Sequence, residues 1–274
     1  MDSRNSSRSR KKAAHPRKSC RKGGTPMPFE RAIIKQIRPN VHLIDDAGES
    51  TCYLITGSEK ALLVDTANGY EDLNEIVRSL TDLPVIVVNT HGHGDHIFGN
   101  VFFDEAWLHP ADNALYDMFF GYAKEEMDKH GLKPCPVKPL PIGQSFDLGG
   151  VQLEVVDLKG HSAGSIGLLD KEGRILYTGD GLNTHIWMQL DHSLPIAALL
   201  ESLRNLKAQH GEDFDYIAHG HAKDLRGKEI LDWMIRGCED ILAGRTENDL
   251  PYEYFGGSCR QHPISDTPGE VIVY

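Results

Sequence analysis

The chain has 274 residues, 40% of them hydrophobic, which is enough for a well-buried core in one large domain or two small ones. Its five cysteines form no CxxC pair and are odd in number, so neither a disulfide framework nor a cysteine zinc site is indicated, and we expect a reducing, cytoplasmic location. The sequence has no run of eighteen apolar residues and no secretory signal at its N-terminus, which predicts a soluble protein without a membrane span.

The net charge of −11 is unevenly distributed along the chain. Residues 1–26 contain nine Lys or Arg and one Asp, so residues 27–274 carry a net charge of −19. Such a basic, apolar-poor segment cannot bury enough surface to order itself, and we predict a disordered arm over 1–26 and a single domain over 27–274. The arm has a nucleic-acid-binding interpretation, but the acidic domain would repel the phosphates that the arm attracts. We favour a solvated tail, or an extension upstream of a natural start at Met27, and expect no nucleic-acid partner.

Short apolar runs separated by Gly, Asp and Asn begin at about residue 31 and predict strands joined by tight turns. A helix is predicted over 71–80 from the spacing of its apolar residues, and "PVIVVNT" (84–90) is typical of a buried strand. A second helix is predicted over 111–130, and the Pro-rich stretch 131–143 predicts an irregular connection. The other predicted strands of this half are 41–46, 51–57 and 60–66.

The second half repeats this order of strands followed by helices. The predicted strands are 151–158, 165–170, 174–180 and 215–220, and the predicted helices are 195–211 and 227–244. Two groups of strands, each followed by helices, predict two sheets packed together with helices outside.

The stretch "HGHGDH" directly after the strand at 84–90 gathers four metal-ligating side chains: His91, His93, Asp95 and His96. Glycines between them let the backbone fold closely around a common point. Neutral imidazoles with a carboxylate suit zinc best, and iron or manganese also fits. Histidines on a loop are often merely solvated, but four ligands at this spacing favour a metal site.

These motifs resemble the metallo-beta-lactamase superfamily, and the resemblance covers most of residues 31–225. It implies an α/β fold, a four-layer αββα sandwich with a metal site along one edge of the paired sheets. Beside HxHxDH, the matching motifs are "LLVDT" with Asp65, "GHSAGS" with His161, "TGDG" with Asp180 and "AHGHA" with His221. Singly, each of these residues has an ordinary interpretation as a turn cap, a strand end or a surface histidine. Their joint order after HxHxDH is what supports the resemblance.

The resemblance implies two metal ions held by seven residues. His91, His93 and His161 would hold the first ion, Asp95, His96 and His221 the second, and Asp180 would bridge them. Asp65 would support the histidine loop without binding metal. His219 competes with His221 as the last ligand; we favour His221, which has the family's Gly before it and a small residue after it, and assign His219 to the surroundings of the site.

The implied activity is hydrolysis of an ester, thioester or lactone of a small molecule by a hydroxide that bridges two zinc ions, with Asp95 as a catalytic residue. Family members that hydrolyse antibiotics usually lack the bridging aspartate, which makes beta-lactam hydrolysis a weaker alternative. Phosphodiester hydrolysis is a second alternative, and a non-catalytic metal-binding scaffold is a third, from another class.

Substrate choice is predicted to depend on the segment after Asp180. His185, Trp187, Met188 and His192 are candidate pocket residues, although Trp187 and Met188 have an equally good interpretation as core residues. The stretch "MFFGY" (118–122) is a second candidate wall, with a stronger core interpretation.

Overall fold

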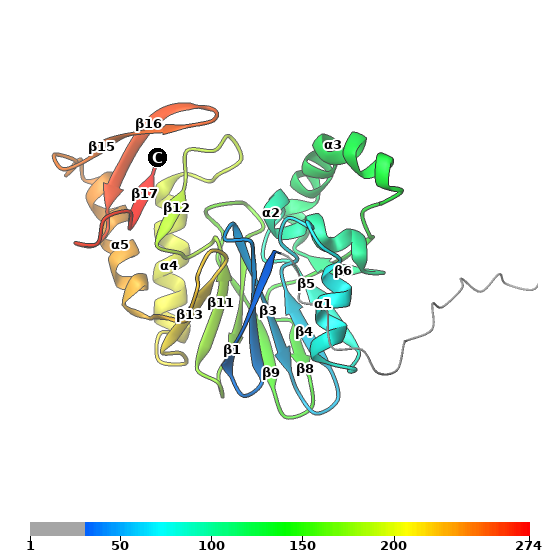
Figure 1. The fold of residues 1–274 in the computed structure, drawn as a ribbon. Helices are drawn as coiled ribbons and strands as arrows, with labels where there is room; N and C mark the ends of the chain where they lie inside the picture. Colours follow the sequence, from blue (N-terminus) through cyan, green and yellow to red (C-terminus); the bar gives the residue numbers. More distant parts are fainter. Residues whose placement is uncertain (1–30) are drawn as a thin grey trace, which may run out of the picture.

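The computed structural model describes residues 31–274, which form two packed sheets, a smaller third sheet and five α-helices (Figure 1). The basic arm predicted over 1–26 lies outside the described residues. Among the helices of residues 31–274, none is long and apolar enough to cross a membrane.

The first sheet is antiparallel from β1 to β4 and parallel from β4 to β7. Its strands, in spatial order, are β1 (Ala32–Arg38), β2 (Val41–Asp46), β3 (Ser50–Thr56), β4 (Ala61–Val64), β5 (Val85–Val88), β6 (Ala106–Leu108) and β7 (Val137–Pro139). Strand β7 lies in the stretch for which the sequence predicts an irregular connection. That prediction is wrong here because an edge strand of three residues tolerates the flanking prolines.

The second sheet is antiparallel except for the pair β11 and β13. Its strands, in spatial order, are β14 (Arg226–Gly227), β13 (Tyr216–His219), β11 (Ile175–Gly179), β10 (Ile166–Asp170), β9 (Gln152–Asp157) and β8 (Ser145–Asp147).

Successive side chains of a strand point to opposite faces of its sheet. Apolar side chains on the inner faces fill the space between the two sheets, and those on the outer faces pack under the helices. On β2, Leu43 lies in the central layer while Ile44 belongs to the outer cluster under α1. Tyr53 and Tyr177 meet across the central layer with ring centroids 5.4 Å apart. The outer face of the second sheet is covered by α4 and α5. The predicted four-layer αββα sandwich is therefore confirmed.

The helices lie close to their predicted positions. They are α1 (Leu73–Leu80), α2 (Gly94–Ile97), α3 (Asn113–His130), α4 (Ile196–His210) and α5 (Glu229–Leu242), with 3-10 turns η1 (Phe98–Phe102) and η2 (Pro110–Asp112). Helix α2 was not predicted: the second half of the HGHGDH stretch is a single helical turn, so Asp95 and His96 project from a helix and not from an open loop.

A third sheet, also absent from the sequence analysis, forms from the last part of the chain. Its strands, in spatial order, are β12 (His185–Trp187), β17 (Val271–Val273), β16 (Gly257–Pro263) and β15 (Leu250–Tyr254). Strand β12 pairs in parallel with β17, far along the chain, and both are too short for a periodic signal. The sheet lies against α5 and projects beyond the sandwich (Figure 1).

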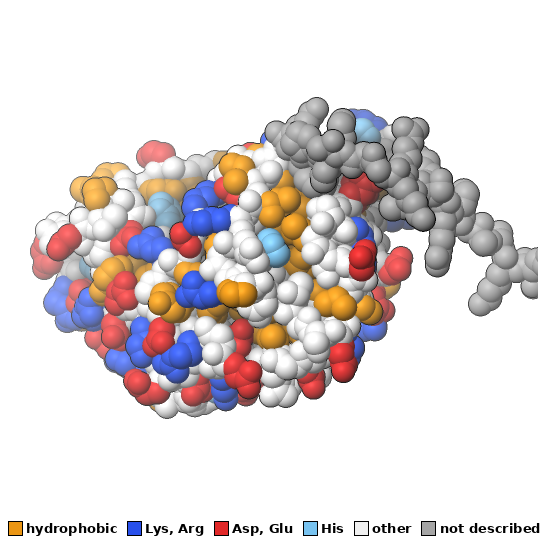
Figure 2. Space-filling view, turned by 60° about the horizontal axis from the view of Figure 1, so that its bottom comes forward, with side chains coloured by type: hydrophobic (Ala, Val, Ile, Leu, Met, Phe, Trp, Pro, Cys, Tyr) orange, Lys and Arg blue, Asp and Glu red, His pale blue; other side chains and the backbone are white. Residues whose placement is uncertain are grey.

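Charged side chains of both signs share the surface. On the face shown in Figure 2, Lys and Arg lie among Asp and Glu and form no continuous basic track over the described residues.

Candidate metal centre

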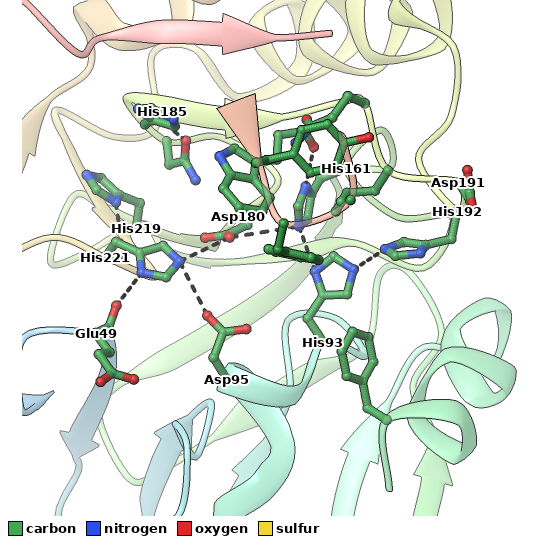
Figure 3. A pocket seen from close by; sticks show the side chains of 18 of the residues that line it. Glu49, His93, Asp95, His161, Asp180, His185, Asp191, His192, His219 and His221 are labelled. Carbon is green, nitrogen blue, oxygen red and sulfur yellow. Dashed lines mark hydrogen bonds and ion pairs between the residues drawn. The ribbon is translucent and has the colours of Figure 1, made fainter. Parts of the chain in front are cut away.

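The predicted ligands converge at one edge of the sandwich, where strands of both sheets end. Figure 3 labels those that line the pocket: His93, Asp95, His161, Asp180 and His221. His91 follows β5, His161 follows β9 and Asp180 follows β11. Strands β11 and β13 are parallel, so the segment after β13 brings His221 to the same edge. Residues spread over 131 positions of sequence thus share one cluster, as the resemblance implies.

Three histidines form the first part of the cluster. The Nδ1 atom of His93 lies 3.0 Å from Nε2 of His91 and 2.8 Å from Nε2 of His161. Neighbouring ligands of a tetrahedral zinc ion, at bond lengths of about 2.0–2.1 Å, are roughly 3.3 Å apart. All three side chains are buried, so the nitrogen atoms face one another and not solvent.

Two carboxylates and two further histidines form the second part. The Nε2 atom of His221 lies 3.1 Å from Asp180 Oδ2 and 3.6 Å from Asp95 Oδ2. The Nε2 atom of His96 lies 3.7 Å from the same Asp180 oxygen and 3.5 Å from Asp95 Oδ2. Asp180 Oδ2 is also 3.8 Å from Nε2 of His161, so this carboxylate lies between the two parts of the cluster.

The outward nitrogen of each of these rings has a hydrogen-bond partner that fixes the ring. His161 Nδ1 donates to the Trp187 carbonyl (2.7 Å) and His221 Nδ1 donates to the Glu49 carbonyl (2.6 Å). His96 Nδ1 donates to the Asp65 carboxylate at 2.8 Å. With Nδ1 protonated, Nε2 keeps its lone pair and points into the cluster, the arrangement that metal-binding histidines need.

Asp65 supports the loop through Thr90 as well. Its Oδ1 accepts from the Thr90 backbone N–H at 2.7 Å, and its Oδ2 accepts from the Thr90 hydroxyl at 2.8 Å. Since that hydroxyl hydrogen is used, Thr90 Oγ1 accepts from His91 Nδ1 at 3.1 Å. One buried carboxylate thereby orients His96 directly and His91 through Thr90, a chain in which Thr90 had no role in the sequence analysis.

His93 is held in a different way, because it turns Nδ1 toward the other histidines. Its Nε2 contacts Nε2 of His192, a residue predicted only as part of the pocket. The Phe119 ring lies against His93 with centroids 5.4 Å apart.

Burial and charge divide the cluster into two electrostatic halves. Burial lowers the pKa of His91, His93 and His161 below the ordinary imidazole value, so these rings are neutral at pH 7. The Asp180 carboxylate raises the pKa of His221 to about 9. Burial by itself would raise the pKa of Asp180, but the charges of His221 and His96 lower it well below the ordinary value. The carboxylate half therefore favours positive charge, whether a proton or a metal ion.

A glycine is required where the segment after β13 passes the cluster. A Cβ atom on Gly220 would lie 2.4 Å from His96 Cε1 and 2.9 Å from Asp180 Oδ1. This close approach is the physical reason for the glycine before His221.

The structure distinguishes the two candidates for the last ligand. His221 belongs to a candidate metal group with Asp95 and His96, whereas His219 belongs to none of the candidate groups among residues 31–274. His219 is buried at the pocket, where its Nδ1 accepts from the His221 backbone N–H (3.3 Å), and burial lowers its pKa to about 4. The geometry favours His221.

Part of the cluster forms the floor of a pocket with a volume of about 1090 Å³, and the predicted ligands that line it are His93, Asp95, His161, Asp180 and His221. His185, Trp187 and His192 line the pocket. Met188 does not: it is buried in the core under α4 and α5, so its assignment to the pocket is wrong and the core interpretation holds. Side chains alternate along a strand, and Trp187 and Met188 therefore face opposite sides of the β12 segment.

The second predicted wall, residues 118–122, divides in the same way. Met118, Phe119 and Tyr122 line the pocket, whereas Phe120 packs in the core against Tyr116. The helical repeat of α3 separates the two sets.

Asp112 is a buried residue of the site that the sequence analysis missed. Its Oδ2 accepts from the Gly92 backbone N–H (2.9 Å) and from the Ser162 hydroxyl (2.7 Å), and its Oδ1 accepts from the Gly164 backbone N–H (2.7 Å). Asp112 thus joins the loop of His91 and His93 to the loop of His161. The sequence signal was weak, because an aspartate before a helix is usually a cap.

The donor set fits divalent metal ions. Three groups of ligand atoms lie within 4.8 Å of one another: His91, His93 and His161; His91, His96 and Asp180; and Asp95, His96 and His221. Two polar atoms of the cluster, His96 Nε2 and Asp180 Oδ1, are buried without a hydrogen-bond partner. Buried polar atoms are rarely left in this state, and a bound cation would satisfy both.

Comparison with known proteins agrees with this geometry. A family model described as "Metallo-beta-lactamase superfamily" matches residues 45–221. An acyl-coenzyme A thioesterase of Gallus gallus is 30% identical over 163 residues, which are 50% of this chain and 58% of the relative. An atrochrysone carboxyl ACP thioesterase of Paecilomyces divaricatus is 29% identical over 232 residues, 79% of this chain and 68% of the relative.

Solved structures show the same fold. A metallo-beta-lactamase from Pontibacter korlensis superposes with a TM-score of 0.61 at 16% identity, over 77% of this chain and 100% of that chain. The present chain spans little more than half the length of the acyl-coenzyme A thioesterases that it matches.

Proposed function

The chain belongs to the metallo-beta-lactamase superfamily, and from this premise we propose that it is a hydrolase with two metal ions that acts on an ester, thioester or lactone of a small molecule. The observation that carries the proposal is the cluster of seven side chains at and below the pocket floor, with His96 Nε2 and Asp180 Oδ1 buried without a hydrogen-bond partner. The thioesterase relatives support the choice of reaction.

His91, His93 and His161 would hold one ion, Asp95, His96 and His221 the other, and Asp180 would bridge them. Zinc suits these ligands best, and iron or manganese also fits. Bound together, the ions would supply an acidified water and a positive charge next to the substrate carbonyl oxygen.

The chain's own residues position and protect this chemistry. Asp65 and Thr90 hold the rings of His96 and His91 in place before substrate arrives, so little reorganisation is needed during the reaction. The Asp95 side chain is 37% exposed at the pocket, and we propose that it takes a proton from the attacking water and returns it to the leaving group.

The cellular setting that we propose is the cytoplasm. The four cysteines among the described residues are free thiols, as expected in a reducing compartment. Cell fractionation would test this location.

The test of function is metal analysis of the purified full chain together with hydrolysis assays on thioester, ester, lactone, phosphodiester and beta-lactam substrates. We expect two metal ions per chain and turnover of a thioester, an ester or a lactone. Asp180→Ala should lower metal content and abolish turnover, whereas Asp128→Ala, which removes an exposed carboxylate on α3, should change neither. Two bound metals with no turnover of any substrate would favour a scaffold. Unchanged activity of the Asp180 variant would refute the assigned site.

A further inference from the structure

Two aromatic walls rise from the pocket floor on opposite sides of the metal cluster. One wall belongs to α3, where Phe119 contacts the rings of His93 and Tyr122, with centroids 5.4 Å and 6.1 Å apart. The other belongs to the third sheet, which carries Trp187 on β12 and three aromatic residues of the β15–β16 hairpin: Tyr252, Tyr254 and Phe255. Both walls line the same pocket.

Trp187 is the centre of the wall formed by the third sheet. Its ring lies 6.2 Å from Tyr252, 6.2 Å from Tyr254 and 5.6 Å from Phe255, measured between centroids. The strand register pairs Tyr254 with Gly257, so Phe255 occupies a two-residue turn at the tip of the hairpin. The hairpin thereby extends a continuous aromatic surface from the floor to the mouth of the pocket.

Within residues 31–274, the outer ends of both walls are left largely uncovered. The exposed fraction is 88% for Phe255 and 75% for Tyr122. A single exposed aromatic residue is ordinary, but here two of them border one opening and are continuous with partly buried rings. A ligand that fills the pocket would cover both.

The charges of the lining restrict what the ligand can be. None of the described residues that line the pocket is Lys or Arg. Besides the predicted metal ligands Asp95 and Asp180, the lining includes the acidic residues Glu49 and Asp191 (Figure 3). A carboxylate or phosphate on the acyl group would therefore meet no Lys or Arg side chain in the described pocket and, away from the metal cluster, would be repelled by Glu49 and Asp191. Aromatic rings on both sides favour a flat apolar group, because rings stack or pack edge to face at centroid separations of about 4.5–7 Å.

We propose that the substrate's acyl group is uncharged and contains one or more aromatic rings, and that Phe255 and Tyr122 are specificity-determining residues that hold it between the two walls. The pocket volume of about 1090 Å³ is large enough for fused rings. This inference rests on the proposed function, since the ester or thioester carbonyl would lie at the metal cluster with the rings directed toward the hairpin tip.

Binding of substrate analogues that cannot be hydrolysed tests this inference independently of catalysis. The probes are non-hydrolysable ketone analogues of N-acetylcysteamine thioesters, with a CH2 group in place of sulfur and a naphthyl, a carboxynaphthyl or a methyl group on the carbonyl. Dissociation constants are measured by calorimetry on the zinc-loaded full chain. We expect the naphthyl ketone to bind at least about tenfold more tightly than the methyl ketone and more tightly than the carboxynaphthyl ketone, from the burial of the rings.

Phe255→Ala and Tyr122→Ala should each weaken naphthyl ketone binding about fivefold, the loss expected for one aromatic contact, and leave methyl ketone binding within twofold. Ile142→Ala, which truncates an exposed apolar residue outside the pocket lining, should change neither. Equal binding of the naphthyl and methyl ketones, tighter binding of the carboxynaphthyl ketone, or no effect of both alanine variants would overturn the inference. Turnover of the naphthoyl thioester is measured separately. If this thioester is not hydrolysed although the naphthyl ketone binds selectively, the proposed hydrolase activity is refuted, whereas recognition of aromatic rings by the two walls is supported.

Discussion

Asp112→Asn tests whether one buried carboxylate holds the two histidine loops together. Asp112 is 1% exposed and accepts three hydrogen bonds, from Gly92, Ser162 and Gly164. An asparagine has the same shape but only one oxygen, so its NH2 group must face one of the two backbone N–H donors. The Ser162 hydroxyl can adapt, because it also lies 2.8 Å from the Ser165 hydroxyl. The backbone N–H of Gly92 or of Gly164, whichever faces the NH2 group, cannot turn to another acceptor in this way.

The cost follows from that one unpaired donor. A buried N–H without an acceptor costs about 1–3 kcal/mol, and the remaining bond loses the strengthening that a charged acceptor gives. We therefore expect the free energy of unfolding to fall by roughly 2–4 kcal/mol. For a domain of this size, this corresponds to a fall in melting temperature of about 4–15 °C. The two loops also lose their relative position, which should weaken metal binding at His91, His93 and His161 by about 10–100-fold.

The assays are urea denaturation of the metal-free chain and zinc titration against a chromophoric chelator. Asp117→Asn, the same substitution at an exposed position on α3, is the matched control and should leave both quantities unchanged. If the Asp112 variant keeps its stability within about 0.5 kcal/mol of the unmodified chain, a value typical of a neutral surface change, the hydrogen-bond reasoning is wrong. Lost stability with unchanged zinc affinity would instead refute the connection between Asp112 and the metal site.

Three further predictions concern the cluster itself. Gly220→Ala should reduce metal content and turnover with little global unfolding, because the new methyl group would collide with His96. The control is Gly121→Ala, since a Cβ atom at Gly121 would meet open space. Equal metal content in the two variants would contradict the predicted collision. Asp65→Asn should weaken zinc binding about 10–100-fold by freeing His96, which a chelator titration measures; unaltered affinity would exclude the support role. Removing metal with a chelator should lower the melting temperature by about 5 °C or more relative to a zinc-saturated sample, since ligand at 100 times its dissociation constant adds about 2.7 kcal/mol. Identical melting curves would show that zinc does not bind the native fold.

Features whose information is local in sequence were predicted well. The HGHGDH stretch places four predicted ligands within six residues, so the chain cannot avoid gathering them near one point. Helix α3 and strand β5 were found because each has its own periodicity or apolar run. The more distant predicted ligands, His161, Asp180 and His221, were proposed from the family resemblance and not from any local signal, and the structure brings them to the same cluster.

Tertiary structure alone decided which side of a short element faces the site. Strand β12 is defined by its pairing with β17, and without that pairing no local pattern separates Trp187 in the pocket from Met188 in the core. The same holds for Asp112, whose partners lie 20 to 52 residues away. The position of Phe255 at the pocket mouth likewise depends on hairpin pairing. A local pattern specifies the ligands that one loop carries, but pairing and packing between distant segments determine the walls around them.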